Sequence, residues 1–426
     1  MKQVRPYPQV TITRKAARSL ASGHPWVFEG EVLSLAPSPL DGTEAINGCL
    51  VDVVEQNGTW QGTGLLSQQS KIRVRIVSRN ANDRFDEGFW RRRIEWAWRH
   101  RQTTMGTRAL PGCAPDTDAC RVVFSEADGL PGLTVDRYGQ VLVAQVGTVG
   151  MELLRGQLYP LFIDVLREDG QDVRAIYERC DSPMREKEGL PLRKGWWDGT
   201  PTLDTRIVVQ ENGLSFDLDL ENSQKTGFFL DQKYNRRAVR KLAQGKRVLD
   251  CFCHVGPFGL NAAAGGAQAV RCVDVSQTAI DLAAANAQLN GLDDRMAFTC
   301  ANVLDYLPRL RTDRTFARAE GGPFDLIVLD PPAFTKSSST VRNASRGYKQ
   351  INYEALRLLP RGGYLATCSC SQHMTRDLLA KAVAEAAHDA NVQLKQVEGR
   401  QQAPHHPILW VFPPSHYLDF FIFQVV

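Results

Sequence analysis

The segment VLDCFCHVGPFGL at residues 248–260 decides the fold. Its apolar start predicts a short strand that ends at Asp250, and Gly256 lies in the following turn, where glycine lets the backbone approach a ligand. An alanine-rich stretch typical of a helix comes next, and a second strand is expected over 269–274. Strands that alternate with helices in this way indicate a doubly wound parallel sheet from residue 205 onward.

The same region has the features of a site for a nucleoside-containing cofactor. Asp274 ends the second expected strand, where a carboxylate can accept hydrogen bonds from two ribose hydroxyls. Capping of the following helix is the alternative role for this residue. The turn lacks the GxGxxG spacing, and Pro257 has no amide to donate, which disfavours a nicotinamide-dependent oxidoreductase.

A second ligand-binding turn follows the strand expected over 324–330. Two prolines after Asp330 fix a rigid turn at the carboxyl edge of the sheet, where open α/β folds bind ligands, and a planar base is the expected guest. The loop that follows has no acid from 333 to 349. Its basic residues are typical of a flexible phosphate-contacting flap, and a plain solvated loop is the alternative. They are Lys336, Arg342, Arg346 and Lys349.

Two cysteines end the strand expected over 364–370. Cys368 and Cys370 share a face there, and Cys251 and Cys253 follow the first strand, so four thiolates around zinc are one interpretation. The C-x-C spacing is shorter than that of usual zinc sites, and we predict no metal. The N-terminal dipole of the next helix would favour a thiolate at Cys370, which makes it a candidate nucleophile rather than an inert thiol.

The N-terminal part differs in pattern and charge. Short β-like runs between glycine turns predict a small β-barrel up to residue 79, and KIRVRIV at 71–77 alternates basic with apolar residues, as a half-buried strand with a solvated face does. Residues 1–100 hold 14 Lys or Arg against 10 Asp or Glu, whereas the other 326 residues hold 37 of each. This surplus indicates a module that faces a polyanion.

Two further patterns complete the sequence. Residues 80–200 predict a compact α/β subdomain whose first helix, near 85–101, buries aromatic residues and exposes arginines. Alternating runs at 409–412 and 418–425 predict an antiparallel hairpin at the edge of the last sheet.

The composition limits the class of protein. With 43% hydrophobic and 23% charged residues, the 426-residue chain matches a globular protein of two or three domains. No apolar run approaches the ~18–20 residues of a membrane span, and the start MKQVRPYPQV lacks a signal-peptide core. Ten cysteines are far too few for a disulfide scaffold. We therefore expect a cytoplasmic protein with no membrane contact.

Seven motifs along the chain resemble one known family, the large-subunit (23S) ribosomal RNA cytosine-C5 methyltransferases with an N-terminal PUA domain. The resemblance covers nearly the whole chain. It is found in GHPWVFEGEV (23–32), SEADGLPGLTVDRYG (125–139), YERCDSPMREKEGL (177–190), QKTGFFLDQKYNRR (224–237), VLDCFCHVGPFGLNAAAGGA (248–267), VLDPPAF (328–334) and TCSCS (367–371).

The resemblance implies a three-part α/β architecture and a site. It implies an RNA-binding PUA-like β-barrel over 1–79, a small central α/β subdomain over 80–200 and a Rossmann-like class I methyltransferase domain over 201–426. Cys370 would be the nucleophile, with Asp330 beside it. The positions implied to bind S-adenosylmethionine are Gln224, Lys225, Thr226, Gly227, Asp250, Gly256, Asp274, Asn302 and Asp330. Substrate-binding is expected of Pro331, Pro332, Phe334, Lys336 and Arg346.

This sequence departs from the family's pattern at three positions. Asn302 stands where the family usually has an adenine-facing Asp, although its amide oxygen can still accept from the adenine amino group. Pro257 stands where the family often has glycine, and His405 replaces a more usual acid.

The chemistry explains the residue types. Cytosine C5 is a poor nucleophile, so a thiolate that adds to C6 is needed to turn C4–C5 into an enamine. Asp330 would hydrogen-bond the N3/N4 edge of the base. The group that removes the C5 proton is not identified, with Cys368 and a water held by Asp330 as candidates.

Two other functions are alternatives. A guanine-N7 ribosomal RNA methyltransferase of similar domain order needs no nucleophile, and Cys370 argues against it. A non-catalytic RNA-binding ribosome assembly factor would not need the near-intact QKTGFFLDQ and DPP motifs. The resemblance leaves open the nucleotide modified, free RNA or an assembly intermediate as substrate, and a homodimer.

Overall fold

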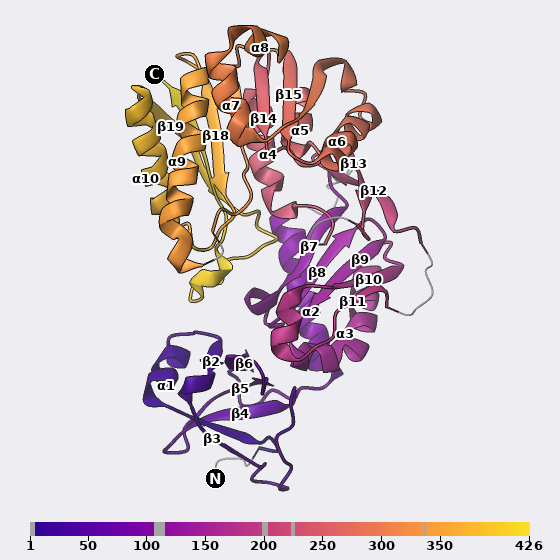
Figure 1. Ribbon diagram of the computed structural model, residues 1–426. Coiled ribbons are helices and arrows are strands. Elements are labelled where there is room, and N and C mark those ends of the chain that lie inside the picture. The colour runs from indigo at the N-terminus through magenta and orange to yellow at the C-terminus, as the bar shows by residue number, and fades with distance from the viewer. Residues whose placement is uncertain (1–4, 106–115, 198–202, 223–225, 336) are drawn as a thin grey trace. The chain divides into compact units, whose positions relative to one another are not determined.

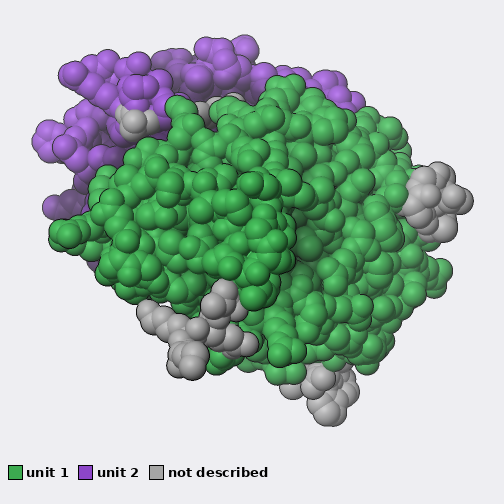
Figure 2. Space-filling model, turned by 90° about the horizontal axis from the view of Figure 1, so that it is seen from below, with its two compact units in different colours: residues 1–209, 218–228, 404–415 green, residues 210–217, 229–403, 416–426 purple. Residues whose placement is uncertain are grey.

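The computed structural model describes residues 5–105, 116–197, 203–222, 226–335 and 337–426. They form two compact units, each assembled from separate parts of the sequence (Figure 2). Unit 1 comprises residues 1–209, 218–228 and 404–415, and unit 2 comprises residues 210–217, 229–403 and 416–426. Among the described helices, none combines the length and the apolar character that crossing a bilayer would need.

The N-terminal part of unit 1 is a six-stranded sheet with the order β2-β6-β5-β4-β1-β3 (Figure 1). Its core is a cluster of Val, Ile, Leu and Ala side chains, into which helix α1 (Arg14–Ala21) contributes Leu20. Thr13 caps this helix by accepting from the Ala16 amide at 3.3 Å. The strands are β1 (Gln9–Ile12), β2 (Trp26–Phe28), β3 (Val32–Ala36), β4 (Leu50–Glu55), β5 (Trp60–Leu66) and β6 (Ile72–Ser78).

The second sheet of unit 1 has five strands in the order β11-β10-β9-β8-β7. Its helices α2 (Glu87–Met105) and α3 (Val149–Glu168) pack against each other, and α2 contacts β7. Helix α2 buries Phe89, Trp90 and Trp98, as its spacing predicts. The strands are β7 (Ala119–Phe124), β8 (Leu133–Tyr138), β9 (Val141–Val146), β10 (Ala175–Cys180) and β11 (Arg193–Trp196).

The prediction of a solvated basic face on 71–77 is wrong for Arg75. Its side chain is buried, and its Nη2 atom lies 2.8 Å from Oε1 of Glu188. The other carboxylate oxygen of Glu188 accepts from the Ser67 hydroxyl at 2.7 Å. The segment that contains Glu188, about 110 residues further along the chain, thus covers this face of β6. The alternation of residues in the strand does not reveal such a contact.

Unit 2 contains a seven-stranded sheet with the order β16-β15-β14-β17-β18-β20-β19. The first five of these run parallel, and β20 pairs antiparallel with both β18 and β19. This is the predicted Rossmann-like sheet. The strands are β14 (Arg247–Cys251), β15 (Ala269–Asp274), β16 (Met296–Cys300), β17 (Leu326–Leu329), β18 (Tyr364–Ser369), β19 (Leu394–Gln401) and β20 (Asp419–Val425).

Two groups of helices accompany this sheet (Figure 1). Helices α4 (Lys233–Leu242), α5 (Pro257–Ala264) and α6 (Gln277–Leu289) form one group. The other group contains α7 (Val303–Thr312), α9 (Val341–Leu358) and α10 (Arg376–Ala390). The second group buries a large apolar cluster against the sheet, which includes Tyr348 and Leu379.

The predicted C-terminal hairpin is correct for only one of its two strands. Residues 418–425 contain β20, but its hairpin partner is β19 at 394–401, and β20 lies inside the sheet rather than at its edge. Residues 409–412 form turns, and Phe412 packs on Trp26 at 4.6 Å between ring centroids. Phe412 therefore serves packing within unit 1, whereas Trp410 is exposed, and the segment does not pair as a strand.

Candidate active site

The turn between β14 and α5 has an unusual backbone. Phe252, His254 and Gly256 have φ values of 61°, 50° and 81°, in the left-handed region that side chains disfavour. A Cβ atom on Gly256 would also lie 3.1 Å from that of Ala283. Pro257 occupies the start of α5, where its missing N–H removes no helical hydrogen bond. The turn therefore tolerates this departure from the family's pattern, and several positive φ values within one short turn are typical of a functional site.

Asp250 lies fully buried at the end of β14. Its Oδ2 atom accepts from the Gly259 amide at 2.8 Å, while Oδ1 has no hydrogen-bond partner among the described residues. Burial raises the pKa of Asp250 to about 8, and the neighbouring Asp330 and Asp274 carboxyls add to the shift. An unsatisfied buried oxygen beside a glycine turn fits a site that a positively charged ligand completes.

Asp274 ends β15 and is oriented by two backbone amides. The amide of His254 donates to Oδ2 at 2.9 Å, and that of Ser276 donates to Oδ1 at 3.0 Å. Helix α6 is capped by Ser276, whose hydroxyl accepts from the Ala279 amide at 3.3 Å. Each carboxylate oxygen retains a lone pair for a ribose hydroxyl. The geometry therefore favours the ribose role over the capping role.

Asn302 is exposed after β16 and caps helix α7. Its Oδ1 atom accepts from the Leu304 amide at 3.1 Å, and its Nδ2 atom donates to Asp305 at 3.0 Å. The adenine contact implied for this residue stays a prediction, because its amide oxygen is already used by the helix.

Asp330 and Cys368 share a hydrogen-bond network at the carboxyl ends of β17 and β18. The Cys368 thiol donates to Asp330 Oδ1 at 2.9 Å, and Nε2 of Gln232 donates to the same oxygen at 3.1 Å. Gln232 in turn accepts from Nδ2 of Asn235 at 2.6 Å. Burial raises the pKa of Asp330, and it raises the pKa of the Cys368 thiol well above its usual value.

Gln232 was not predicted as a site residue. It is the last residue of the QKTGFFLDQ segment. Its position after the apolar residues of this segment could have indicated a site residue, because an amide buried there needs a polar partner. Gln232 comes from the segment before α4, and only the fold brings it to β17.

Cys370 differs from Cys368 in its surroundings. It lies just past β18, is half-buried, and its Sγ atom is 3.9 Å from the Pro331 carbonyl oxygen. Between the two cysteines, the Ser369 hydroxyl donates to Tyr348 at 2.9 Å. The structure thus brings Cys370 to the DPP turn and leaves this residue partly accessible. Among the described residues, no cluster of three or more His, Cys, Asp or Glu has the geometry of a metal site.

The predicted flexible flap at 333–349 is wrong in its second half. Helix α9 begins at Val341, so Arg346 is an exposed helical residue, and Lys349 lies 2.8 Å from Asp389 of helix α10. The segment contains no acid of its own, but a neighbouring helix supplies one. The ring centroids of Phe334 and Tyr348 lie 4.8 Å apart, so Phe334 has a structural role as well.

The remaining predicted residues fall into three groups. Pro331 is buried and Pro332 exposed. Thr226 belongs to unit 1, where its hydroxyl donates to Asp136 at 2.5 Å, and Gly227 has a φ of 141°. Gln224, Lys225 and Lys336 lie outside the described residues.

His405 belongs to unit 1 rather than to the β19–β20 hairpin. Its Nδ1 atom accepts from the Arg121 amide at 3.2 Å, and its carbonyl accepts from Arg101 at 2.9 Å. The imidazole is therefore a buried structural acceptor.

Known proteins match the chain over nearly its whole length. Residues 191–415 match the model of an S-adenosylmethionine-dependent methyltransferase family, and residues 10–79 match a PUA-like domain. A protein of Shewanella amazonensis named ribosomal RNA large subunit methyltransferase I is 40% identical over 410 residues, which cover 96% of this chain and 97% of that protein. A protein of the same name from Klebsiella pneumoniae is 37% identical and covers 99% of both chains.

Solved structures show the same fold at lower identity. A putative methyltransferase from Streptococcus mutans superposes with a TM-score of 0.77 at 20% identity, over 98% of this chain and 100% of that one. A putative methyltransferase complexed with SAH gives a TM-score of 0.78 at 21% identity, with the same coverage. The chain therefore belongs to the family of S-adenosylmethionine-dependent methyltransferases that are named ribosomal RNA large subunit methyltransferase I and have a PUA-like domain at the N-terminus.

Proposed function

We propose that this protein transfers a methyl group to C5 of a cytosine in 23S ribosomal RNA through a covalent bond between Cys370 and C6 of the base. The single observation that carries the proposal is the contrast at the end of β18. Cys368 is buried and donates its thiol proton to Asp330, whereas Cys370 is partly accessible beside the Pro331 carbonyl. The names of the relatives support ribosomal RNA of the large subunit as substrate.

The proposed domain organisation is supported at its N-terminus by the PUA-like match over residues 10–79. We retain three domains at residues 1–79, 80–200 and 201–426, and we place the reaction in the cytoplasm, where bacterial ribosomes are assembled. A homodimer stays a prediction.

The cofactor supplies an electrophilic methyl group on a positively charged sulfonium. We propose that Asp274 holds its ribose and that Gly256 permits its close approach to the backbone. Asp250 offers an unsatisfied oxygen, and a positive charge nearby favours its ionised form. Thr226, Gly227, Gln224 and Lys225 are proposed contacts by motif alone.

In the proposed reaction the Cys370 thiolate adds to C6, and the C5–C6 double bond is used to form a nucleophilic enamine. C5 then takes the methyl group as the bond from carbon to sulfonium sulfur breaks. Loss of the C5 proton and departure of the Cys370 thiolate restore the double bond. The thiol of Cys370 must be ionised before the first step, and it is returned ionised after the last.

Asp330 is proposed to bind the N3/N4 edge of the cytosine. Burial raises its pKa, so this carboxyl takes up a proton more readily than an exposed acid does, and in that form it can donate to N3 as addition at C6 increases electron density there. Gln232 and Cys368 hold the other side of this carboxyl and fix its orientation. Cys368 is a poor candidate for the base that removes the C5 proton, because it is itself a protonated donor. A water held by Asp330 remains the candidate.

Guanine-N7 methylation is the second candidate. N7 is already nucleophilic and needs no covalent help, so a partly accessible cysteine beside the DPP turn would have no role in that reaction. An RNA-binding assembly factor without activity would not need the unsatisfied oxygen of Asp250.

Replacement of the nucleophile is the first test. Cys370→Ala is expected to abolish methylation of large-subunit RNA and to leave S-adenosylmethionine affinity within a few-fold of the wild type, because the thiol does not hold the cofactor. Methyl incorporation and calorimetry measure the two properties. Cys300→Ala is the matched control, because Cys300 is exposed at the end of β16 on the same sheet and should be dispensable.

RNA containing 5-fluorocytosine should form a denaturant-resistant adduct with the wild type and with Cys300→Ala, and none with Cys370→Ala. Full methylation by Cys370→Ala, or an adduct mapped to Cys368, would contradict the assignment.

The ribose assignment has its own test. Asp274→Ala is expected to weaken S-adenosylmethionine binding by about 1–3 kcal/mol, because two ribose hydroxyls lose their acceptor. Calorimetry measures the change, and Asp281→Ala on the exposed side of helix α6 is the control that should bind normally. Unchanged affinity in Asp274→Ala would move the cofactor elsewhere.

Asp250 makes stability depend on pH. Its pKa is raised from about 3.9 in an unfolded chain to about 8 here, so the folded state binds the proton more tightly. Its stabilising contribution is complete below about pH 4 and is lost as pH rises through about 8. We expect the cofactor-free wild type to lose stability over this range relative to Asp250→Asn, by at most about 1.4 kcal/mol per pH unit. Denaturant unfolding from pH 5 to pH 9 measures this, and parallel curves for the two proteins would contradict it.

A further inference from the structure

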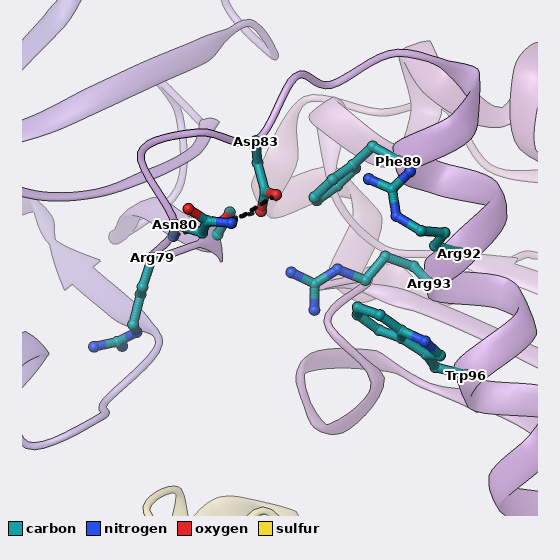
Figure 3. Close-up of a pocket in the computed structure, with 8 residues that line it drawn as sticks. Arg79, Asn80, Asp83, Phe89, Arg92, Arg93 and Trp96 are labelled. Atoms are coloured by element: carbon teal, nitrogen blue, oxygen red, sulfur yellow. Dashed lines mark hydrogen bonds between the residues drawn. The ribbon is translucent and has the colours of Figure 1, made fainter. Parts of the chain in front are cut away.

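A cavity of about 360 Å³ lies in unit 1 between the end of β6 and helix α2 (Figure 3). Its size is near the lower end of the ~300–1,000 Å³ of small-ligand sites, which gives room for about one nucleotide. We call it the β6–α2 cavity. The polar and aromatic side chains that give it its character are Arg79, Asn80, Asp83, Arg92, Arg93 and Trp96.

The β6–α2 cavity has an excess of positive charge. Arg79 donates to the His24 carbonyl at 2.8 Å, and Arg93 donates to the Val77 carbonyl at 2.7 Å. Carbonyl oxygens carry no net charge, so these bonds orient the guanidinium groups without neutralising them. In the described chain, neither of these arginines nor Arg92 forms an ion pair with a carboxylate.

The single acid of the cavity, Asp83, offsets the positive charge only in part, and its carboxylate partly counters the lowering of the Arg93 pKa that burial causes. Asp83 accepts from the Ser78 hydroxyl at 2.5 Å and from the Asn80 amide at 3.2 Å, both of which are neutral. Three cations therefore face one anion, and the wall of the cavity attracts a negatively charged group such as a phosphate.

An indole ring stands next to these cations. Trp96 is 55% exposed, although Phe89, about two turns earlier on α2, is buried. The Arg93 guanidinium lies 5.7 Å from the Trp96 ring centroid and 5.1 Å from that of Phe89, between the two rings (Figure 3). An exposed indole beside stacked arginine is the arrangement on which unpaired nucleobases stack.

We propose that the β6–α2 cavity binds one unpaired nucleotide of the RNA substrate, with the base on Trp96 and the phosphate at Arg92. This rests on the proposed function only in that the substrate is RNA. None of the residues in the cavity belongs to unit 2, where the reacting groups lie, so its role is to recognise the substrate rather than to react with it. A paired base is already stacked in its helix and cannot stack on Trp96.

The test compares three variants of the full chain. Trp96→Ala and Arg92→Ala remove the stacking surface and one exposed charge, and Arg99→Ala removes an exposed arginine of the same helix that does not line the cavity. Fluorescence anisotropy of a labelled single-stranded RNA of twelve nucleotides, about the length that such grooves cover, is measured over a series of salt concentrations.

Trp96→Ala should weaken binding at least about five-fold with an unchanged salt dependence, because base stacking is lost. Arg92→Ala should weaken it and reduce the slope of log affinity against log salt by about 0.7, the value for one phosphate contact on a single strand. Arg99→Ala and the S-adenosylmethionine affinity of all three variants should match the wild type. Photocrosslinking of RNA containing 4-thiouridine should label the α2 peptide with Trp96 in the wild type.

Wild-type affinity in both cavity variants, or crosslinks only outside α2, would overturn the proposal. Loss of affinity for a purified ribosomal protein with normal RNA binding would assign the cavity to a protein partner instead. If Cys370→Ala fails to lose methylation while Trp96→Ala still weakens RNA binding, the reaction is misassigned and the cavity stands. If Cys370→Ala loses methylation while Trp96→Ala binds RNA normally, the proposed reaction stands and the nucleotide site in the cavity is rejected.

Discussion

The parallel pairing of β14, β15, β17 and β18 is the constraint on which the site depends. It carries the ends of four strands to one edge of the sheet, so that Asp250, Asp274, Asp330 and Cys370 lie together although 120 residues separate the first from the last. The hydrogen bonds from Gln232 and Cys368 then fix the Asp330 carboxyl, and its burial raises its pKa. Cys368 thereby donates to the acid, and Cys370, the nucleophile that we propose, lies at the same edge of the sheet.

The parallel sheet and the residues at its carboxyl edge could largely be predicted from the sequence, because strand-and-helix alternation and motif spacing are local signals. The strand ends with Asp250, Asp274 and Asp330 follow directly from them. Contacts between distant segments could not be predicted, because no local pattern contains them. Examples are the Gln232 amide on Asp330, the Glu188 carboxylate on Arg75 and the Asp389 carboxylate on Lys349. The strand predicted over 409–412 is wrong for the same reason, because apolar alternation does not distinguish a strand from a turn that packs against a distant segment.

The structure shows which basic residues of the described N-terminal part are paired with acids and which are not. Arg75, on the strand that the sequence marks as basic, is neutralised by Glu188, whereas Arg79 and Arg93 are held on uncharged carbonyls. Part of the charge available to a polyanion therefore lies at the β6–α2 cavity, past the end of β6. In this account unit 1 supplies recognition and unit 2 supplies the reaction, and the two contributions are separable by substitution.

The central claim is that the protein methylates C5 of a cytosine in large-subunit ribosomal RNA. Its most direct test is mass-spectrometric mapping of ribosomal RNA from cells with and without the gene. The account predicts that one 5-methylcytosine of the large-subunit RNA is present with the gene and absent without it, while all other methylated positions are unchanged. Loss of a methyl group from guanine N7, or an identical set of modifications in the two strains, would contradict it.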